Sequence, residues 1–294
     1  MSIITTQRFP HVDKFGITEG LDQNHSLHSF ITFAAFAAEN SGSPHNMAKV
    51  YEEGTASGDP TWGTGDYGPV LSYDGAGDYH TFPTRQLVDL DKPFTVAYRI
   101  LHRTASGSPV SLTIKTGVAN KPLELFFSTT LTTYKPFAFG QANSGAANLG
   151  PTTDDGVSPA MNLWHDIAFS YNGSGSAGIT TPGNWQLWWN QKNETVINTD
   201  AFGGVTDQTS LGAQPTGGNA ADCDIDYLVV LDGIEAPELL QRPEQVLRLI
   251  ESQSRVVFLP VAAAGGGRIM SSLANHGGLA GYGGIAGDGG GLAA

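Results

Sequence analysis

Short segments in which apolar and polar residues alternate recur along most of the chain. In residues 94–100 every even-numbered position is large and apolar, whereas the odd-numbered positions are Thr, Ala and Arg. Similar alternation appears in residues 112–114, 167–171, 185–189 and 227–231. Successive side chains of a β-strand point to opposite faces, so a period of two predicts strands with one apolar face.

Clusters rich in glycine and other turn-forming residues separate these segments, at residues 74–77, 106–109, 172–175 and 216–219. Many short strands with such punctuation are typical of a sandwich or a barrel. Near the C-terminus, Pro237 and Pro243 each occupy a plausible first position of a helix, and Val246, Leu249 and Ile250 form an apolar stripe. We therefore predict an all-β, two-sheet antiparallel jelly-roll sandwich with short C-terminal helices, and a last strand at residues 255–260.

The ends of the chain differ from this central part. Residues 1–24 have few periodic apolar positions and are predicted to form an extended N-terminal arm, so the sandwich spans residues 25–260. Residues 261–294 are a glycine-rich tail, in which glycine recurs at every third position from Gly278 to Gly290. That is the period of a polyproline-II-type chain. Two interpretations remain: a tail that orders in a homo-oligomer, most simply a trimer, or a flexible linker.

Charge and cysteine content exclude several classes of protein. The 28 acidic and 15 basic residues give a net charge of −13, and no cluster of Lys or Arg exists that could neutralise phosphates, so nucleic-acid binding is not expected. A single cysteine, Cys223, excludes an internal disulfide framework and a cysteine-based zinc site. The N-terminus lacks the pattern of a signal peptide, and the apolar run at 32–38 is too short to span a bilayer. We expect assembly in the cytoplasm and no membrane insertion.

Several segments, in order, match a known pattern: residues 31–42, 70–79, 94–98, 164–171 (WHDIAFSY), 185–190 and 224–239. Together they resemble the strands of laminin-G-like domains in the concanavalin A-like lectin/glucanase superfamily. The resemblance implies a lectin-like, concanavalin A-like jelly roll. Asn190 replaces the Asp-Gly that usually follows the tryptophan strand, which puts the family's rim loops in doubt here.

The arm, the strand at 255–260 and the glycine-rich tail look like those of laminin-G-like proteins among tailed-bacteriophage virion genes. This resemblance implies a non-enzymatic virion structural protein, either a head decoration or fibre or a tail-associated subunit. Its partners would be other virion subunits and a host-surface polysaccharide, and its location the virion, assembled in the host cytoplasm. The alternative is a free carbohydrate-binding module of a cell-surface or secreted system.

Sequence signatures of catalysis are absent. A retaining glucanase needs two carboxyl groups about 5–5.5 Å apart, yet no Glu-x-Asp-x-x-Glu run or near variant occurs. Metalloprotease, serine-hydrolase and phosphate-loop motifs are missing too. Residues 63–68 match the glycine spacing of a dinucleotide site, but they lead into a predicted strand rather than a helix, so we interpret them as a loop. We expect no enzymatic activity, and a degenerate hydrolase is the third hypothesis.

Two groups of residues are candidates for ligand binding. Asp222, Asp224 and Asp226 alternate on one strand face, where a hard, oxygen-seeking Ca²⁺ ion could bridge them. The competing interpretation is a buried Asp226 that accepts hydrogen bonds from loop amides beside two solvated neighbours, with no cofactor. Alternation also places Trp188 on the face opposite to Trp185 and Trp189, so Trp188 is the candidate for stacking on a sugar ring.

Overall fold

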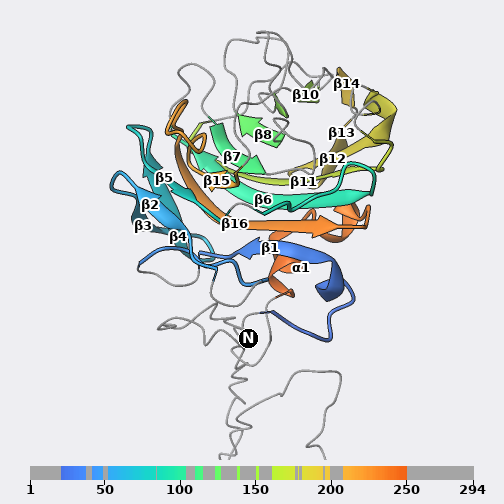
Figure 1. Ribbon diagram of the computed structural model, residues 1–294, viewed down its shortest axis with the longest axis horizontal. Helices are drawn as coiled ribbons and strands as arrows, with labels where there is room; N and C mark the ends of the chain where they lie inside the picture. Colours follow the sequence, from blue (N-terminus) through green and yellow to red (C-terminus); the bar gives the residue numbers. More distant parts are fainter. Residues whose placement is uncertain are drawn as a thin grey trace, which may run out of the picture.

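The computed structural model describes residues 21–37, 42–48, 52–83, 85–103, 110–114, 123–126, 138–139, 150–151, 161–175, 178, 181–194, 196–198 and 208–249. Within them two antiparallel sheets face each other (Figure 1), which confirms the predicted all-β sandwich. Residues 1–20 of the predicted arm (1–24), the strand predicted at 255–260 and the glycine-rich tail lie outside the described residues. No helix in the described ranges is long and apolar enough to span a bilayer.

The larger sheet is built around β6 and β16, which pair along nearly their whole length. Its order is β13 (Lys192–Glu194), β12 (Trp185–Trp189), β11 (Trp164–Tyr171), β6 (Phe94–His102), β16 (Asp222–Asp232), β4 (Gly68–Asp74) and β3 (Thr61–Gly65). On its other side β16 pairs first with β4 and then with β1 (Ile31–Ala35). The register between β16 and β6 shifts between Ile225 and Tyr227, so the strand carries an irregularity at Asp226.

The smaller sheet has the order β2 (Thr55–Ser57), β5 (Tyr79–Thr81), β15 (Ser210–Leu211), β7 (Val110–Ile114), β8 (Leu123–Phe126) and β9 (Ala138–Phe139). A separate pair joins β10 (Gly150–Pro151) and β14 (Val196–Asn198). The short helices are η1 (His28–Phe30), η3 (Pro182–Asn184), η4 (Pro237–Leu239) and α1 (Pro243–Leu247). The helices predicted to begin at Pro237 and Pro243 are therefore confirmed.

Residues 63–68, interpreted from the sequence as a loop, belong to a β-hairpin instead. Strand β3 runs to Gly65, and after two turn residues β4 begins at Gly68. Glycine is needed at Gly65, where a Cβ atom would lie 2.7 Å from a methyl group of Val70 and 3.0 Å from the ring of Trp164. The glycine spacing thus serves close packing of a hairpin.

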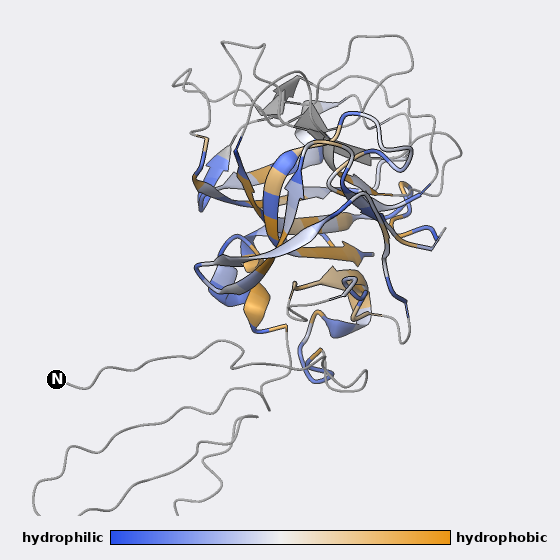
Figure 2. Cartoon of the chain, turned by 90° about the vertical axis from the view of Figure 1, so that its left-hand side faces the viewer, coloured by the Kyte–Doolittle hydropathy of each residue, from blue (hydrophilic) through white to orange (hydrophobic). Residues whose placement is uncertain are grey.

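The main core lies between the two sheets, and Figure 2 shows hydrophobic residues recurring along the strands of the sandwich. The large sheet contributes the side chains at every second position of β6, β11 and β12, including Ile167, Phe169 and Trp189. The smaller sheet and the loops beside it supply Phe82, Leu112, Ile114 and Leu211. The apolar periodicity of the sequence therefore identified the inner face of these strands.

A second apolar layer covers the outer face of the large sheet. There Ala97, Ala168 and Val229 from three adjacent strands are fully buried. The residues that cover this face come from the segment before β1 and from the two C-terminal helices and the turns around them: Leu21, Leu27, Leu240, Val246, Leu247 and Leu249. Figure 1 shows β1 and α1 on the same side of β16. Both faces of the central strands are therefore buried.

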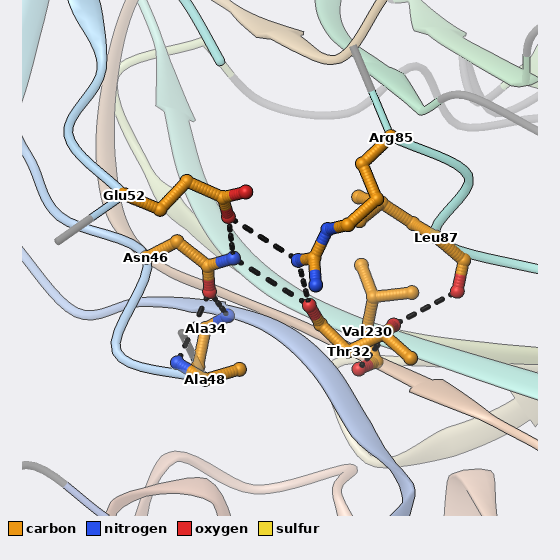
Figure 3. A network of polar contacts seen from close by, with 8 residues as sticks. All are labelled: Thr32, Ala34, Asn46, Ala48, Glu52, Arg85, Leu87 and Val230. Carbon is orange, nitrogen blue, oxygen red and sulfur yellow. Dashed lines mark hydrogen bonds and ion pairs between the residues drawn. The ribbon is translucent and has the colours of Figure 1, made fainter. Parts of the chain in front are cut away.

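Strand β1 lies at an edge, and a side-chain network satisfies the backbone groups that no neighbouring strand reaches (Figure 3). Asn46, which is buried, accepts hydrogen bonds from the backbone N–H groups of Ala34 (2.9 Å) and Ala48 (3.1 Å). Its amide nitrogen donates to the carboxylate of Glu52 and to the Thr32 carbonyl. Arg85 also donates to that carbonyl, at 2.6 Å. Exposed strand edges invite pairing with other chains, and this network closes the edge of β1.

Replacing Asn46 with alanine is expected to destabilise the sandwich by about 2 kcal/mol. The substitution leaves the buried N–H of Ala34 without its acceptor, and an unsatisfied buried polar group costs roughly 1–3 kcal/mol. Urea unfolding followed by intrinsic fluorescence measures the change. Asn193→Ala, at an exposed position of β13, is the matched control and should stay near the wild-type value. Equal stability of the two variants would contradict the role assigned to Asn46.

Candidate functional site

The three aspartates predicted to share a calcium ion bind two different arginines on the outer face of the large sheet. Arg103 Nε donates to Asp222 at 2.6 Å, and its Nη1 donates to Asp224. Its Nη2 also donates to the carbonyl of Tyr73 at 2.7 Å. Asp226 instead pairs with Arg99, at 3.3 Å between Nε and Oδ2. The three carboxylates therefore do not converge on one point.

A cation already sits beside each of these carboxylates, in the form of a guanidinium group. No group of three or more His, Cys, Asp or Glu side chains within the described ranges could hold a metal ion. Binding of Ca²⁺ at Asp222, Asp224 and Asp226 stays a prediction, and an ion would have to displace Arg103.

Arg99 forms the centre of a charged group that we call the Arg99 cluster. Its members come from three strands and one hairpin turn: Arg99, Asp66, Tyr67, Trp164, Asp166 and Asp226. Nη1 lies 2.6 Å from Asp166, and Nη2 lies 2.7 Å from Asp66. The guanidinium carbon is 4.7 Å from the centroid of the Tyr67 ring and 5.0 Å from that of Trp164, within range of cation–π attraction. Only 5% of Arg99 is exposed.

Asp166 has a raised pKa in this cluster. Burial is the largest cause, because it disfavours the charged carboxylate; Arg99 acts in the opposite direction, and the nearby Glu244 and Asp66 raise the pKa further. One guanidinium thus faces more carboxylates than it can neutralise. The cluster is consistent with a cross-link between strands, and its buried groups leave little surface for a ligand.

The tryptophans of β12 divide between the two faces of the sheet as predicted. Trp185 and Trp189 are buried in the core between the sheets, where Trp185 lies 4.7 Å from the ring of Tyr171. Trp188 points to the outer face, is half-buried, and packs against the edge of the second apolar layer. Of these three indoles, that of Trp188 is the most exposed, although its Nε1 atom is buried.

On its exposed side Trp188 has four polar or apolar surface residues around it, and together they form what we call the Trp188 patch: Gln186, Trp188, Asn193, Glu235 and Leu239. In the sheet Trp188 stands between Ala168 of β11 and Asn193 of β13. Gln186 precedes it by two residues on the same face of β12 and is exposed. Leu239 is 47% exposed and belongs to η4, which packs against β11 and β12.

Glu235, in the turn after β16, is held in place by two neutral donors. Its Oε1 atom accepts hydrogen bonds from Gln186 Nε2 at 2.8 Å and from Ser170 Oγ at 3.3 Å. Within the described part of the chain, its Oε2 atom accepts none. The patch thus combines the indole of β12, a carboxylate bonded to a residue two positions along the same strand, and an exposed aliphatic side chain of the helix that packs on this strand. The sequence pattern indicated Trp188 but not Glu235, which lies outside any strand.

Comparisons with known proteins support the architecture. No protein-family model matches the chain, and no curated protein matches its sequence. The binding domain of Paraclostridial Mosquitocidal Protein 1 matches with a TM-score of 0.50 and 9% identity, covering 72% of this chain and 51% of that one. Domain 4 of AbnA, an extracellular GH43 arabinanase from Geobacillus stearothermophilus, matches with a TM-score of 0.48 and 14% identity, covering 75% and 98%.

A carbohydrate esterase from the Shiga toxin-encoding bacteriophage phi24B, vb_24B_21, also matches. Its TM-score is 0.45 and its identity 17%, over 69% of this chain and 98% of that chain. At such low identities a structural likeness speaks for the fold alone, and the first of these matches agrees with the β-sandwich described above.

Proposed function

We propose that the chain is a non-enzymatic, glycan-binding β-sandwich that a tailed bacteriophage displays on its virion, with the Trp188 patch as the glycan site. The observation that carries the binding proposal is the partly exposed indole of Trp188 on the face of β12 where Gln186, two residues away, holds the carboxylate of Glu235. Aromatic faces with a few placed polar groups are the usual lining of small-molecule sites. The apolar face of a pyranose would stack on the indole, and its hydroxyl groups would donate to Glu235 and Asn193.

The non-enzymatic part of the proposal is supported by the way the large sheet uses its carboxylates. Four aspartates on its outer face, and Asp66 in the adjoining hairpin turn, form ion pairs with Arg99 or Arg103. Glycoside hydrolysis needs one carboxyl group that can donate a proton and a second that can attack or activate water. Carboxylates committed to ion pairs suit neither role.

The position of the two ends of the described domain supports display by a larger assembly. The N–H of Asp22 donates to the carbonyl of Leu249 at 2.8 Å, so the two ends of the described domain lie side by side. Residues 1–20 and 250–294 are therefore attached at one place on the sandwich. A domain tethered by both ends at one pole leaves the rest of its surface free, as a displayed virion module requires.

Replacing Trp188 with alanine is expected to abolish glycan binding while the sandwich stays folded. Stacking on the indole is the main apolar contact that the patch offers, and Trp is among the residues that most often dominate binding energy. Binding of the full chain to host-surface polysaccharides, measured by calorimetry or on a glycan array, tests this. Leu163→Ala, which removes another exposed apolar side chain (57% exposed), is the control and should bind as the wild type does.

Binding that survives in Trp188→Ala, or no binding of the wild type to any glycan, would overturn the proposed site.

Removing residues 261–294 is expected to reduce the subunit count without unfolding the sandwich. The glycine-rich tail has too little apolar area to fold alone, but glycine at every third position lets extended chains pack closely, most simply as a trimer. Light scattering of the full chain and of residues 1–260 compares the two particles, and circular dichroism checks the fold. An unchanged subunit count would assign the tail to a linker.

A further inference from the structure

Glu235 holds a negative charge that no basic side chain in the described ranges neutralises. The two groups that bind its Oε1 atom, the amide of Gln186 and the hydroxyl of Ser170, are both uncharged. None of the ion pairs between described residues includes Glu235. The residue is half-buried, so water screens its charge less than at an open surface. A carboxylate in this state attracts a cation.

The surroundings of the patch also favour a positively charged ligand. Arg99 and Arg103, which face the same side of the sheet, are both engaged by aspartates. Glu238, in the adjacent helix η4, adds a second and exposed carboxylate. The whole chain carries a net charge of −13. An anionic sugar would be repelled on approach and would find no basic partner in the patch.

The indole of Trp188 also prefers a cation. The face of a tryptophan ring carries partial negative charge and attracts ammonium groups, by about 0.5–2 kcal/mol. Gln186 and Trp188 are two residues apart on one face of β12, roughly 6.6 Å along the strand. Since Gln186 binds Glu235 directly, a substituent on a ring stacked over Trp188 can reach Oε2, the oxygen that accepts no hydrogen bond from the described residues.

From this geometry we infer that the sugar unit bound by the Trp188 patch is an amino sugar with a free, protonated amine. The pyranose ring stacks on Trp188, and the ammonium group pairs with Oε2 of Glu235 while Oε1 stays bound to Gln186 and Ser170. The inference rests on the proposed glycan site and specifies the ligand class for it.

Calorimetry with three matched oligosaccharides on the full-length protein tests the inference: a glucosamine oligomer, its fully N-acetylated form and a glucose oligomer of equal length. The glucosamine oligomer is expected to bind at least tenfold more tightly than either neutral one, and added salt should weaken that preference. Glu235→Gln keeps an acceptor for Gln186 but removes the charge, and should lower affinity for the amine about tenfold with little change for the neutral sugars. Glu238→Gln removes an equal charge nearby and is the control.

The outcomes separate the inference from the proposed site. The three oligomers could bind the wild type equally well, lose their affinity in Trp188→Ala and keep it in Glu235→Gln. In that case the assigned ligand class is wrong, and the proposed binding site is supported. The same conclusion follows if an acidic oligosaccharide binds best through Trp188. If Glu238→Gln weakens binding as much as Glu235→Gln does, the effect is one of overall charge and the specific ion pair is refuted. If none of the three oligomers binds, the amino-sugar assignment is refuted; if Trp188→Ala changes the binding of no glycan, both proposals fail.

Discussion

Replacing Arg99 with methionine is expected to lower the free energy of unfolding by about 3–5 kcal/mol, because removing one partner of a buried ion pair leaves the other charge uncompensated. Asp166 and Asp226 are both nearly buried, and Arg99 pairs with each. Methionine has a similar length and keeps much of the apolar packing. The loss of stability therefore reflects the missing guanidinium charge. Urea denaturation measures the change in the free energy of unfolding, with the same dependence of that free energy on urea concentration used for the wild type and the variant.

Two further variants make this result specific. Asp66→Asn removes the partner of Arg99 that is 63% exposed, and exposed ion pairs contribute only about 0–1 kcal/mol. The triple variant Arg99→Met, Asp166→Asn, Asp226→Asn also removes the two carboxylates that would otherwise be buried without a partner. It should therefore recover a large part of the lost free energy of unfolding. If Arg99→Met costs no more than Asp66→Asn, the Arg99 cluster does not stabilise the sheet in the way described.

The inner face of the sandwich was predictable because one physical rule determines it. Strands β6, β11 and β12 alternate apolar and other residues with period two, and the apolar set is the set that packs between the sheets. The opposite orientations of Trp188 and Trp189 follow from the same rule. Local patterns suffice here because the cause is local.

The outer face was not predictable from the same pattern. From the sequence, Ala97 and Thr95 suggest that the outer face of β6 is partly exposed to solvent. Both residues are nevertheless fully buried. The residues that cover this face are distant in the sequence, among them Leu21 before the first strand and Leu249 after the last helix. A single strand's periodicity cannot reveal which later segment returns to cover it.

The electrostatic partners were missed for a related reason. Asp222, Asp224 and Asp226 do share one face of β16, as expected from their spacing. Arg99 in β6 and Arg103 just after its end lie four residues apart, and the pairing of β6 with β16 brings both arginines to the aspartates. The register shift at Asp226 then separates that residue from the other two. Recognising the ion pairs would have required the strand pairing and its irregularity in advance.

Glu235 of the candidate site illustrates the same limit. It sits in a turn, outside any periodic segment, and reaches the patch because the chain reverses after β16 toward η4. Trp188 carries a signal in the sequence through its size and its place in a strand. A glutamate in a turn carries none until its neighbour Gln186 is known.

Acidification from pH 7 to pH 5 is expected to lower the free energy of unfolding by about 4 kcal/mol through two buried histidines. Burial lowers the pKa of His80 to about 4 and that of His102 to about 3, from 6.5. Both stay neutral in the folded state at pH 5, whereas in the unfolded chain they take up a proton below pH 6.5. The unfolded state therefore binds more protons, and each histidine contributes about 2 kcal/mol of loss over this interval.

The sign follows from the lowered pKa values of the two histidines. Their contribution to the free energy of unfolding is fully present above pH 6.5. It is lost as the pH falls toward 4 for His80 and toward 3 for His102. The raised pKa of Asp166 acts the other way and returns some stability at low pH. Urea unfolding at pH 7 and pH 5 measures the difference. In His102→Leu the difference should shrink by about 2 kcal/mol, whatever the absolute stability of the variant. Asn46→Ala, which loses stability without losing a titratable group, should keep the full difference, and a His102→Leu variant that also kept it would show that His102 is not the neutral buried group described here.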